Sequence, residues 1–133
     1  MSDSAPLPFA HARALLAAVP FDVERVREQL EANHGGYQIV HTSPGLEIGV
    51  YVLVAPEVDR QEPHADDEVY IVLDGTGVLE VEGQPVGLER GQAVFVAAGA
   101  RHVFTEYERL SLLVIFARRW RLEPPTGRAP RPV

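Results

Sequence analysis

Residues 61–68 (QEPHADDE) bring an imidazole and several carboxylates together immediately before the apolar run Val69–Leu73. An ionised carboxylate that leaves water without a partner carries a large free-energy penalty, so core packing alone gives no reason to gather acids at the start of a strand. A bound cation is the simplest partner for them. A second imidazole, His102, follows another apolar run, Ala93–Val96, and a turn of small residues. His64, His102 and a glutamate therefore predict a divalent-metal site.

The segments that must position these side chains have the pattern of short β-strands. From Tyr37 onward, short apolar runs alternate with Gly, Pro and Asp turns, and residues 74–77 (DGTG) and 82–84 (EGQ) are typical hairpin turns. This spacing favours an antiparallel all-β sandwich or barrel over alternating βαβ units. The predicted strands are Tyr37–Thr42, Leu46–Val54, Glu68–Leu73, Val78–Val81, Pro85–Leu88, Ala93–Val96, His102–Thr105 and Leu110–Ala117.

Two of these runs, Val69–Leu73 and Leu112–Phe116, are apolar on both faces. A strand in a two-layer barrel has this pattern when helices or a second subunit cover its outer face. We therefore expect a homodimer.

The first third of the chain has a helical pattern. Ala10–Val19 is rich in alanine and leucine and ends before a proline, and Asp22 is a suitable N-cap for a second helix, Val23–Asn33, which residues 35–36 (GG) would stop. Apolar residues recur at helical spacing in the second helix, so one stripe of it can cover the barrel or form an interface. These residues are Val23, Val26 and Leu30.

The composition fits one compact domain. The chain has 133 residues, of which 46% are hydrophobic, and it contains no cysteine, so disulfides, a thiolate nucleophile and a cysteine-ligated zinc site are excluded. Its first residues are acidic and lack the basic and then apolar pattern of a leader segment. No run approaches the roughly 18 apolar residues of a membrane span. We expect a cytoplasmic protein that has a helical segment at 1–36, a barrel at 37–117 and a basic, proline-rich tail at 118–133.

The charge is unevenly distributed along the chain. The net charge is −7, with −11 in residues 1–117 and +4 in residues 118–133. An acidic body is a poor surface for phosphate backbones, because nucleic-acid binding depends on clustered Lys and Arg. The composition of the tail favours an extended segment or an arm that contacts a partner subunit.

Residues 46–117 resemble the cupin superfamily, whose small double-stranded β-helix barrels carry two short motifs. In the first motif, His64 fills the second histidine position, Glu68 follows after three residues and Gly75 after six more. In the second motif, Gly91, Gly99 and His102 are in register, while Ala97 replaces the proline and Glu106 the final asparagine. The resemblance implies a mainly β fold, an antiparallel double-stranded β-helix of the jelly-roll type, here with N-terminal helices.

The resemblance also implies a ligand set. His64, Glu68 and His102 are the implied metal ligands, and Glu62 stands at the first histidine position, where it is a possible fourth ligand or a general base. Gln61 is another candidate if the chain carries a bulge there. On an extended chain, Glu62 and His64 point to the same face, and Glu68 rejoins them if the loop returns in phase. Imidazole and carboxylate ligands suit Fe, Mn, Zn or Ni.

Two further residues complete the predicted pocket, and three functions stay open. Tyr70 faces the same interior as Glu68 and either donates a hydrogen bond to a ligand or fills the barrel, and Arg101 lines the pocket or holds Glu68.

The first hypothesis for the function is a metal-dependent enzyme for a small organic molecule, either dioxygenase-like or isomerase- or cyclase-like. The second is a non-catalytic module that binds a small metabolite, and the third, a structural interaction protein, leaves the acidic cluster unexplained.

Overall fold

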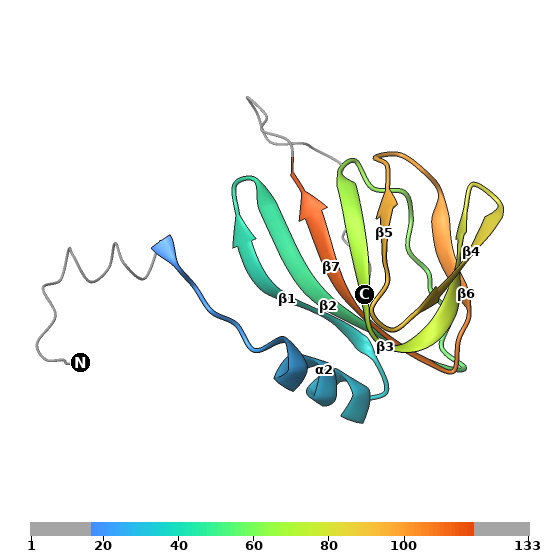
Figure 1. The fold of residues 1–133 in the computed structure, drawn as a ribbon, viewed down its shortest axis with the longest axis horizontal. Helices are drawn as coiled ribbons and strands as arrows, with labels where there is room; N and C mark the ends of the chain where they lie inside the picture. Colours follow the sequence, from blue (N-terminus) through green and yellow to red (C-terminus); the bar gives the residue numbers. More distant parts are fainter. Residues whose placement is uncertain (1–16, 119–133) are drawn as a thin grey trace, which may run out of the picture.

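The structure is a computed structural model that describes residues 17–118, and β-strands dominate it (Figure 1). All the strand pairs in this range are antiparallel, as predicted. The elements, in chain order, are α2 (Val23–Ala32), β1 (Gly36–Ser43), β2 (Leu46–Val54), β3 (Asp67–Val81), β4 (Gln84–Glu89), β5 (Ala93–Val96), β6 (His102–Glu106) and β7 (Arg109–Ala117).

Helix α2 confirms the second predicted helix and its cap. The Asp22 side chain accepts a hydrogen bond from the backbone N–H of Arg25 at 3.0 Å, and Glu24 adds a negative charge in the first turn. Both features compensate the free N–H groups at a helix N-terminus. The helix contacts β1 and β2 and covers one end of the sheet that these strands form (Figure 1). Residues 10–16 of the predicted first helix lie outside the described residues.

Most of the predicted strands form where the sequence pattern places them. Strands β2 and β5 have the predicted bounds, and β1, β4, β6 and β7 differ from the prediction by one residue at one or both ends, but the two strands predicted at Glu68–Leu73 and Val78–Val81 are one continuous strand, β3. The hairpin at residues 82–84 is confirmed, because Val81 pairs with Gln84 across a turn in which Glu82 and Gly83 both have positive φ.

The hairpin predicted at residues 74–77 is wrong, because β3 runs through it without reversing. The register between β3 and β7 shifts between Val72 and Asp74, which bends the strand instead of ending it. Gly75 has a φ of +85°, and a Cβ there would lie 2.0 Å from the backbone oxygen of Arg109. A glycine in a strand interior can mark a bend or a close backbone approach as well as a turn, and Gly75 does so here.

The bend lets β3 belong to both layers of the barrel. Its first half pairs with β7 and β5, and its second half pairs with β4 and β6 (Figure 1). The first layer continues from β7 through β2 to β1. The core fills the space between the layers with large side chains, among them Tyr51, Tyr70, Leu79, Phe104, Leu110, Leu112, Val114 and Phe116.

The outer face of the first layer keeps apolar side chains half-buried. Val69, Ile71 and Ile115 alternate with the core residues along β3 and β7, and Phe95 on β5 is 61% exposed. The homodimer expected from these strands stays a prediction, as do the three segment boundaries. Within residues 17–118, no helix has the length and apolar character that a bilayer crossing requires.

Candidate metal centre

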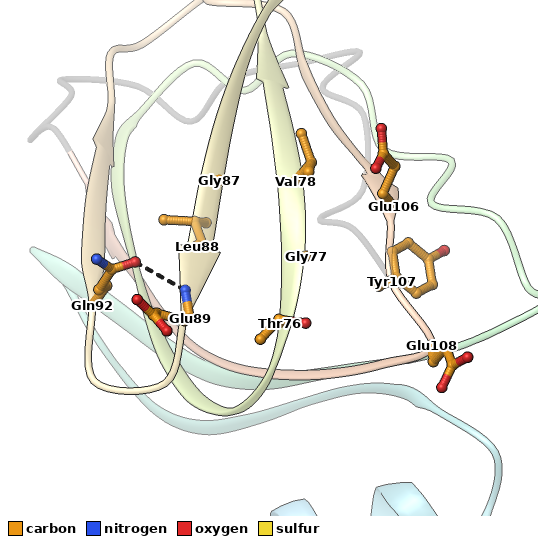
Figure 2. Close-up of a pocket in the computed structure, with 10 residues that line it drawn as sticks. All are labelled: Thr76, Gly77, Val78, Gly87, Leu88, Glu89, Gln92, Glu106, Tyr107 and Glu108. Atoms are coloured by element: carbon orange, nitrogen blue, oxygen red, sulfur yellow. Dashed lines mark hydrogen bonds between the residues drawn. The ribbon is translucent and has the colours of Figure 1, made fainter.

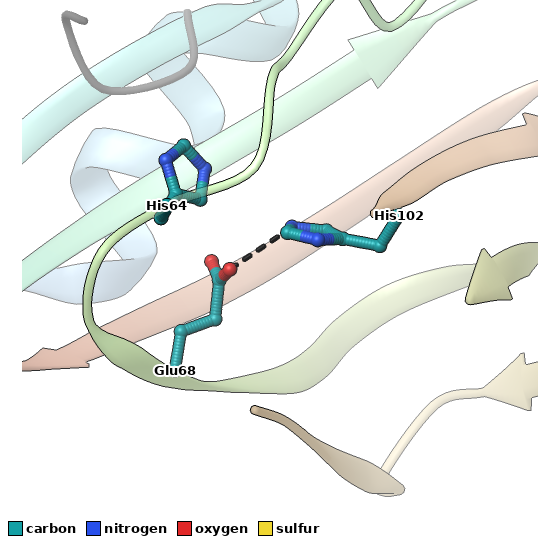
Figure 3. Close-up of side chains that lie close together, drawn as sticks. All are labelled: His64, Glu68 and His102. Carbon is teal, nitrogen blue, oxygen red and sulfur yellow. Dashed lines mark ion pairs between the residues drawn. The ribbon is translucent and has the colours of Figure 1, made fainter. Parts of the chain in front are cut away.

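Three predicted ligands converge inside one end of the barrel. His64 lies in the loop before β3, Glu68 is the second residue of β3 and His102 is the first residue of β6 (Figure 3). One potential ligand atom from each side chain lies within 4.8 Å of those from the other two. The exposed fractions of the three residues are 7%, 1% and 5%, so the group is screened from bulk water.

Strand geometry places Glu68, and a loop held against the barrel places His64. Glu68 alternates with β3 residues of the outer face and stands beside Phe116 of β7 in the pairing register, so its side chain enters the interior. The carbonyl oxygen of His64 accepts a hydrogen bond from the Gly99 N–H at 2.7 Å, and its ring packs edge-on against Phe116. The glycine of the second motif therefore anchors the histidine of the first.

The ring orientation of His102 presents a lone pair or a proton to Glu68. Its Nδ1 lies 2.9 Å from the Ala100 carbonyl oxygen, which only accepts, so Nδ1 carries a hydrogen. Its Nε2 lies 3.0 Å from Glu68 Oε1. Two acceptors do not approach this closely without a cation between them, so either a proton or a metal ion belongs there. A histidine that ligates a metal usually donates its other ring N–H to a carbonyl or carboxylate.

Without a metal, the proton is the favoured cation. Burial lowers the pKa of His102, but the hydrogen bond to Glu68, the contact with Ala100 and the nearby negative charges outweigh burial and raise this pKa above its usual value. The arginine alternative for Glu68 is wrong, because Glu68 pairs with His102 while Arg101 is exposed.

The second oxygen of Glu68 has no hydrogen-bond partner within residues 17–118. Among the described residues, Glu68 Oε2 is buried and makes no hydrogen bond, although a buried carboxylate oxygen normally has at least one. A divalent ion beside two imidazoles would supply the missing interaction, and the two imidazoles and the carboxylate are ligands that such an ion accepts. The residues present therefore fit a metal ion.

Tyr70 faces the interior beside this group and is fully buried. Its hydroxyl donates to Gln61 Oε1 at 2.9 Å and lies 3.1 Å from His102 Nε2. Burial raises the pKa of Tyr70 far above its usual value, and the negative charge of Glu68 adds to the effect, so the phenol keeps its proton at neutral pH.

The structure does not bring Glu62 to the three ligands. Residues 61–66 do not form a strand, so the even spacing of Glu62 and His64 does not place them on one face. The Glu62 side chain is exposed, and the neighbouring Gln61 points inward instead: its Oε1 lies 3.3 Å from His64 Nε2.

Sequence reasoning missed Asp59, which is 4% exposed. Its carboxylate receives hydrogen bonds from the hydroxyl of Tyr51, from both nitrogens of Gln61 and from the backbone N–H of Phe104, at 2.6 to 3.4 Å. Asp59 stands in a polar stretch without a motif, so only its place five residues before the first ligand pointed to it.

A pocket of about 320 Å³ adjoins the site, and its lining includes Gln61, Arg101 and His102. A larger pocket, of about 660 Å³, is lined by parts of β3 and β4 and by residues 106–108 (Figure 2). It shares no residue with the three ligands, so the smaller pocket is the candidate entrance for a small molecule.

The sequence matches the family described as "Cupin domain" over residues 49–116. An uncharacterized protein of Streptomyces coelicolor is 35% identical over 98 residues, which cover 73% of this chain and 93% of that protein. An acireductone dioxygenase of a Sulfurihydrogenibium species is 41% identical over 49 residues, but these cover 34% of this chain and 27% of that protein.

The fold has a counterpart among solved structures. A cupin family protein of Methanocaldococcus jannaschii, described as RmlC-like with a double-stranded β-helix fold, superposes with a TM-score of 0.57 at 19% identity. The alignment covers 62% of this chain and 79% of that one. The predicted double-stranded β-helix is therefore confirmed.

Proposed function

Because this chain belongs to the cupin domain family, we propose that it binds one divalent metal ion through His64, Glu68 and His102 and acts with it on a small organic molecule. The molecule would enter through the pocket beside Gln61 and Arg101.

The observation that carries the proposal is the hydrogen bonding of Glu68 and His102, whose side chains face each other in the interior. Glu68 is a buried carboxylate, one of whose oxygens has no hydrogen-bond partner in the described part of the chain, and His102 directs Nε2 at the other oxygen while its Nδ1 donates to a carbonyl. A protein that needed only a stable core would fill this space with apolar groups, because a buried carboxylate without full hydrogen bonding is costly.

The bound ion would supply Lewis acidity and, if it is Fe or Mn, a route to oxygen chemistry. The chain's own groups would then orient the substrate and control protons. Tyr70 holds a phenolic proton next to His102, and this proton stays in place at neutral pH because of burial. Phe116 packs against His64 and keeps water from that side of the site.

Two reaction classes remain for an enzyme of this kind, an oxygen-dependent cleavage or oxidation and a metal-assisted isomerisation or cyclisation. The local similarity to an acireductone dioxygenase supports the first class. The second candidate function is a non-catalytic module that captures a small metabolite. The absence of an imidazole at the first ligand position of the motif favours it, because Glu62 stands there.

The first test is the metal content of protein purified without a nickel affinity step, compared with the double variant His64→Ala, His102→Ala. We expect close to one ion per chain in the wild type and a negligible amount in the double variant. Equal and negligible contents in both proteins would refute the proposal.

The second test separates the enzyme from the binding module. A panel of small organic acids, enediols and sugars is screened by thermal stabilisation, and each stabilising compound is then followed by oxygen uptake and product analysis. A binding module shows stabilisation without a product, whereas an enzyme consumes the compound and loses that activity when the metal is removed.

A further inference from the structure

We propose that the side-chain oxygen of Gln61 is a fourth metal ligand and that Asp59 is the positioning residue that aims it. This inference rests on the metal-binding function proposed above and extends it to two residues that the family motif does not mark.

The distances place Gln61 Oε1 beside His64 and connect it to His102 through the Tyr70 hydroxyl. It lies 3.3 Å from His64 Nε2 and 2.9 Å from the Tyr70 hydroxyl, which in turn lies 3.1 Å from His102 Nε2. Two donors that share an ion at about 2.1 Å are about 3.0 to 3.4 Å apart in octahedral or tetrahedral geometry. The separation of Gln61 Oε1 from His64 Nε2 falls in that range, as does the 3.0 Å between His102 Nε2 and Glu68 Oε1.

The direction of the Gln61 amide follows from its partners. Gln61 Nε2 lies 2.6 Å from Asp59 Oδ2, and a carboxylate oxygen only accepts, so the amide nitrogen must be on the Asp59 side. The amide oxygen then faces the interior, where the Tyr70 hydroxyl donates to it. A metal ion binds the oxygen of an amide and not its NH₂ group, so the hydrogen bond to Asp59 presents the atom that can ligate.

Asp59 is itself rigidly held. Its Oδ1 accepts from the Tyr51 hydroxyl at 2.7 Å, and its Oδ2 accepts from the Phe104 backbone N–H at 2.8 Å. Tyr51 lies on β2 and Phe104 on β6, so the carboxylate connects elements of both layers to the loop that carries Gln61. A ligand supported by such outer hydrogen bonds is oriented before the ion arrives.

The charges of the site also balance with this assignment. Glu68 contributes one negative charge as a ligand, and Asp59 contributes a second negative charge immediately behind Gln61. Together they offset a divalent cation in a site that is screened from water. Glu62 is the alternative fourth ligand from the motif register, but its side chain is exposed.

The test measures the dissociation constant of Zn²⁺ by competition with a chromophoric chelator. The proteins are the wild type, Gln61→Ala, Gln61→Leu, Glu62→Ala, Asp59→Asn and the double variant Asp59→Asn, Gln61→Ala. Circular dichroism and thermal melts of the apo proteins check folding, and Gln61→Leu keeps the side-chain volume in case the alanine variant is unstable. The Co²⁺ absorption spectrum of each protein gives a second readout, because it reports the number and type of ligands.

We expect the Gln61 variants to weaken Zn²⁺ binding about 10- to 100-fold and to change the Co²⁺ spectrum, while Glu62→Ala matches the wild type in both. Asp59→Asn should weaken binding about tenfold alone and by clearly less when Gln61 is already absent, because only the loss of its negative charge then remains.

The outcomes separate this inference from the proposed function. If the wild type binds Zn²⁺ through His64 and His102 but Gln61→Ala and Gln61→Leu bind it equally well, the assignment of Gln61 is wrong and the metal centre stands. The inference is also overturned if only Glu62→Ala weakens Zn²⁺ binding, or if Asp59→Asn has its full effect in the double variant. If the wild type binds no ion, the proposed function falls as well.

Discussion

Replacing Gly75 with alanine tests how β3 joins the two layers of the barrel. Two costs combine at this position. An L residue at a φ of +85° costs about 1–2 kcal/mol. The new Cβ would also lie 2.0 Å from the Arg109 backbone oxygen, and since a backbone atom cannot rotate away, the β3–β7 pairing must shift, at about 1–3 kcal/mol as in overpacked cores.

Gly83→Ala is the matched control. Gly83 has a φ of +81°, but no atom lies within 4 Å of a Cβ built there, so only the conformational cost applies. In both variants the alanine also lowers the conformational entropy of the unfolded chain, which offsets about 0.4–1 kcal/mol of the lost stability. We therefore expect a net loss of about 1 kcal/mol for Gly83→Ala and about 3 kcal/mol for Gly75→Ala.

The assay is urea unfolding of the apo proteins followed by circular dichroism, with the free energy of unfolding taken from the midpoint and slope. The difference of about 2 kcal/mol should also appear as a melting temperature about 6–10 °C lower for Gly75→Ala than for Gly83→Ala. Equal losses in the two variants would refute the close approach of β3 to β7 at Gly75.

Three other predictions concern stability and metal binding. Asp22→Ala should lower the free energy of unfolding by about 1 kcal/mol because it removes the N-cap of α2, whereas Asp22→Asn keeps an acceptor and should be nearly neutral; urea midpoints measure both. Phe104→Ala should cost about 3–5 kcal/mol, since a 1% exposed ring leaves a cavity between the layers, and a loss below about 1 kcal/mol in the same assay would contradict its place in the core. Zn²⁺ at 100 times its dissociation constant should stabilise the wild type by about 2.7 kcal/mol, seen as a higher melting temperature that excess chelator reverses, and an unchanged melting temperature would count against a specific site.

The strands were predictable because local patterns determine them. The β2 and β5 segments are apolar runs bounded by turn residues, and the turn at Glu82 and Gly83 follows from a short polar stretch between two strands. The turn signal at residues 74–77 misled, because whether Gly75 closes a hairpin or admits a neighbouring backbone depends on β7, more than thirty residues later.

The site was predictable in part for a similar reason. His64, Glu68 and His102 keep the spacing of a family motif, and the structure brings their side chains together. Gln61 points toward the site in place of Glu62 because the loop before β3 follows an irregular path, which strand periodicity does not describe. Asp59 stayed hidden because its partners Tyr51 and Phe104 come from two other strands and meet it only in the folded chain.

Anomalous X-ray scattering from crystals of the metal-loaded protein tests the central claim most directly. Data collected on either side of the absorption edge of the added metal should show one strong peak within bonding distance of His64, Glu68 and His102. A peak elsewhere, or none while His102 still contacts Glu68 directly, would contradict a metal centre in this barrel.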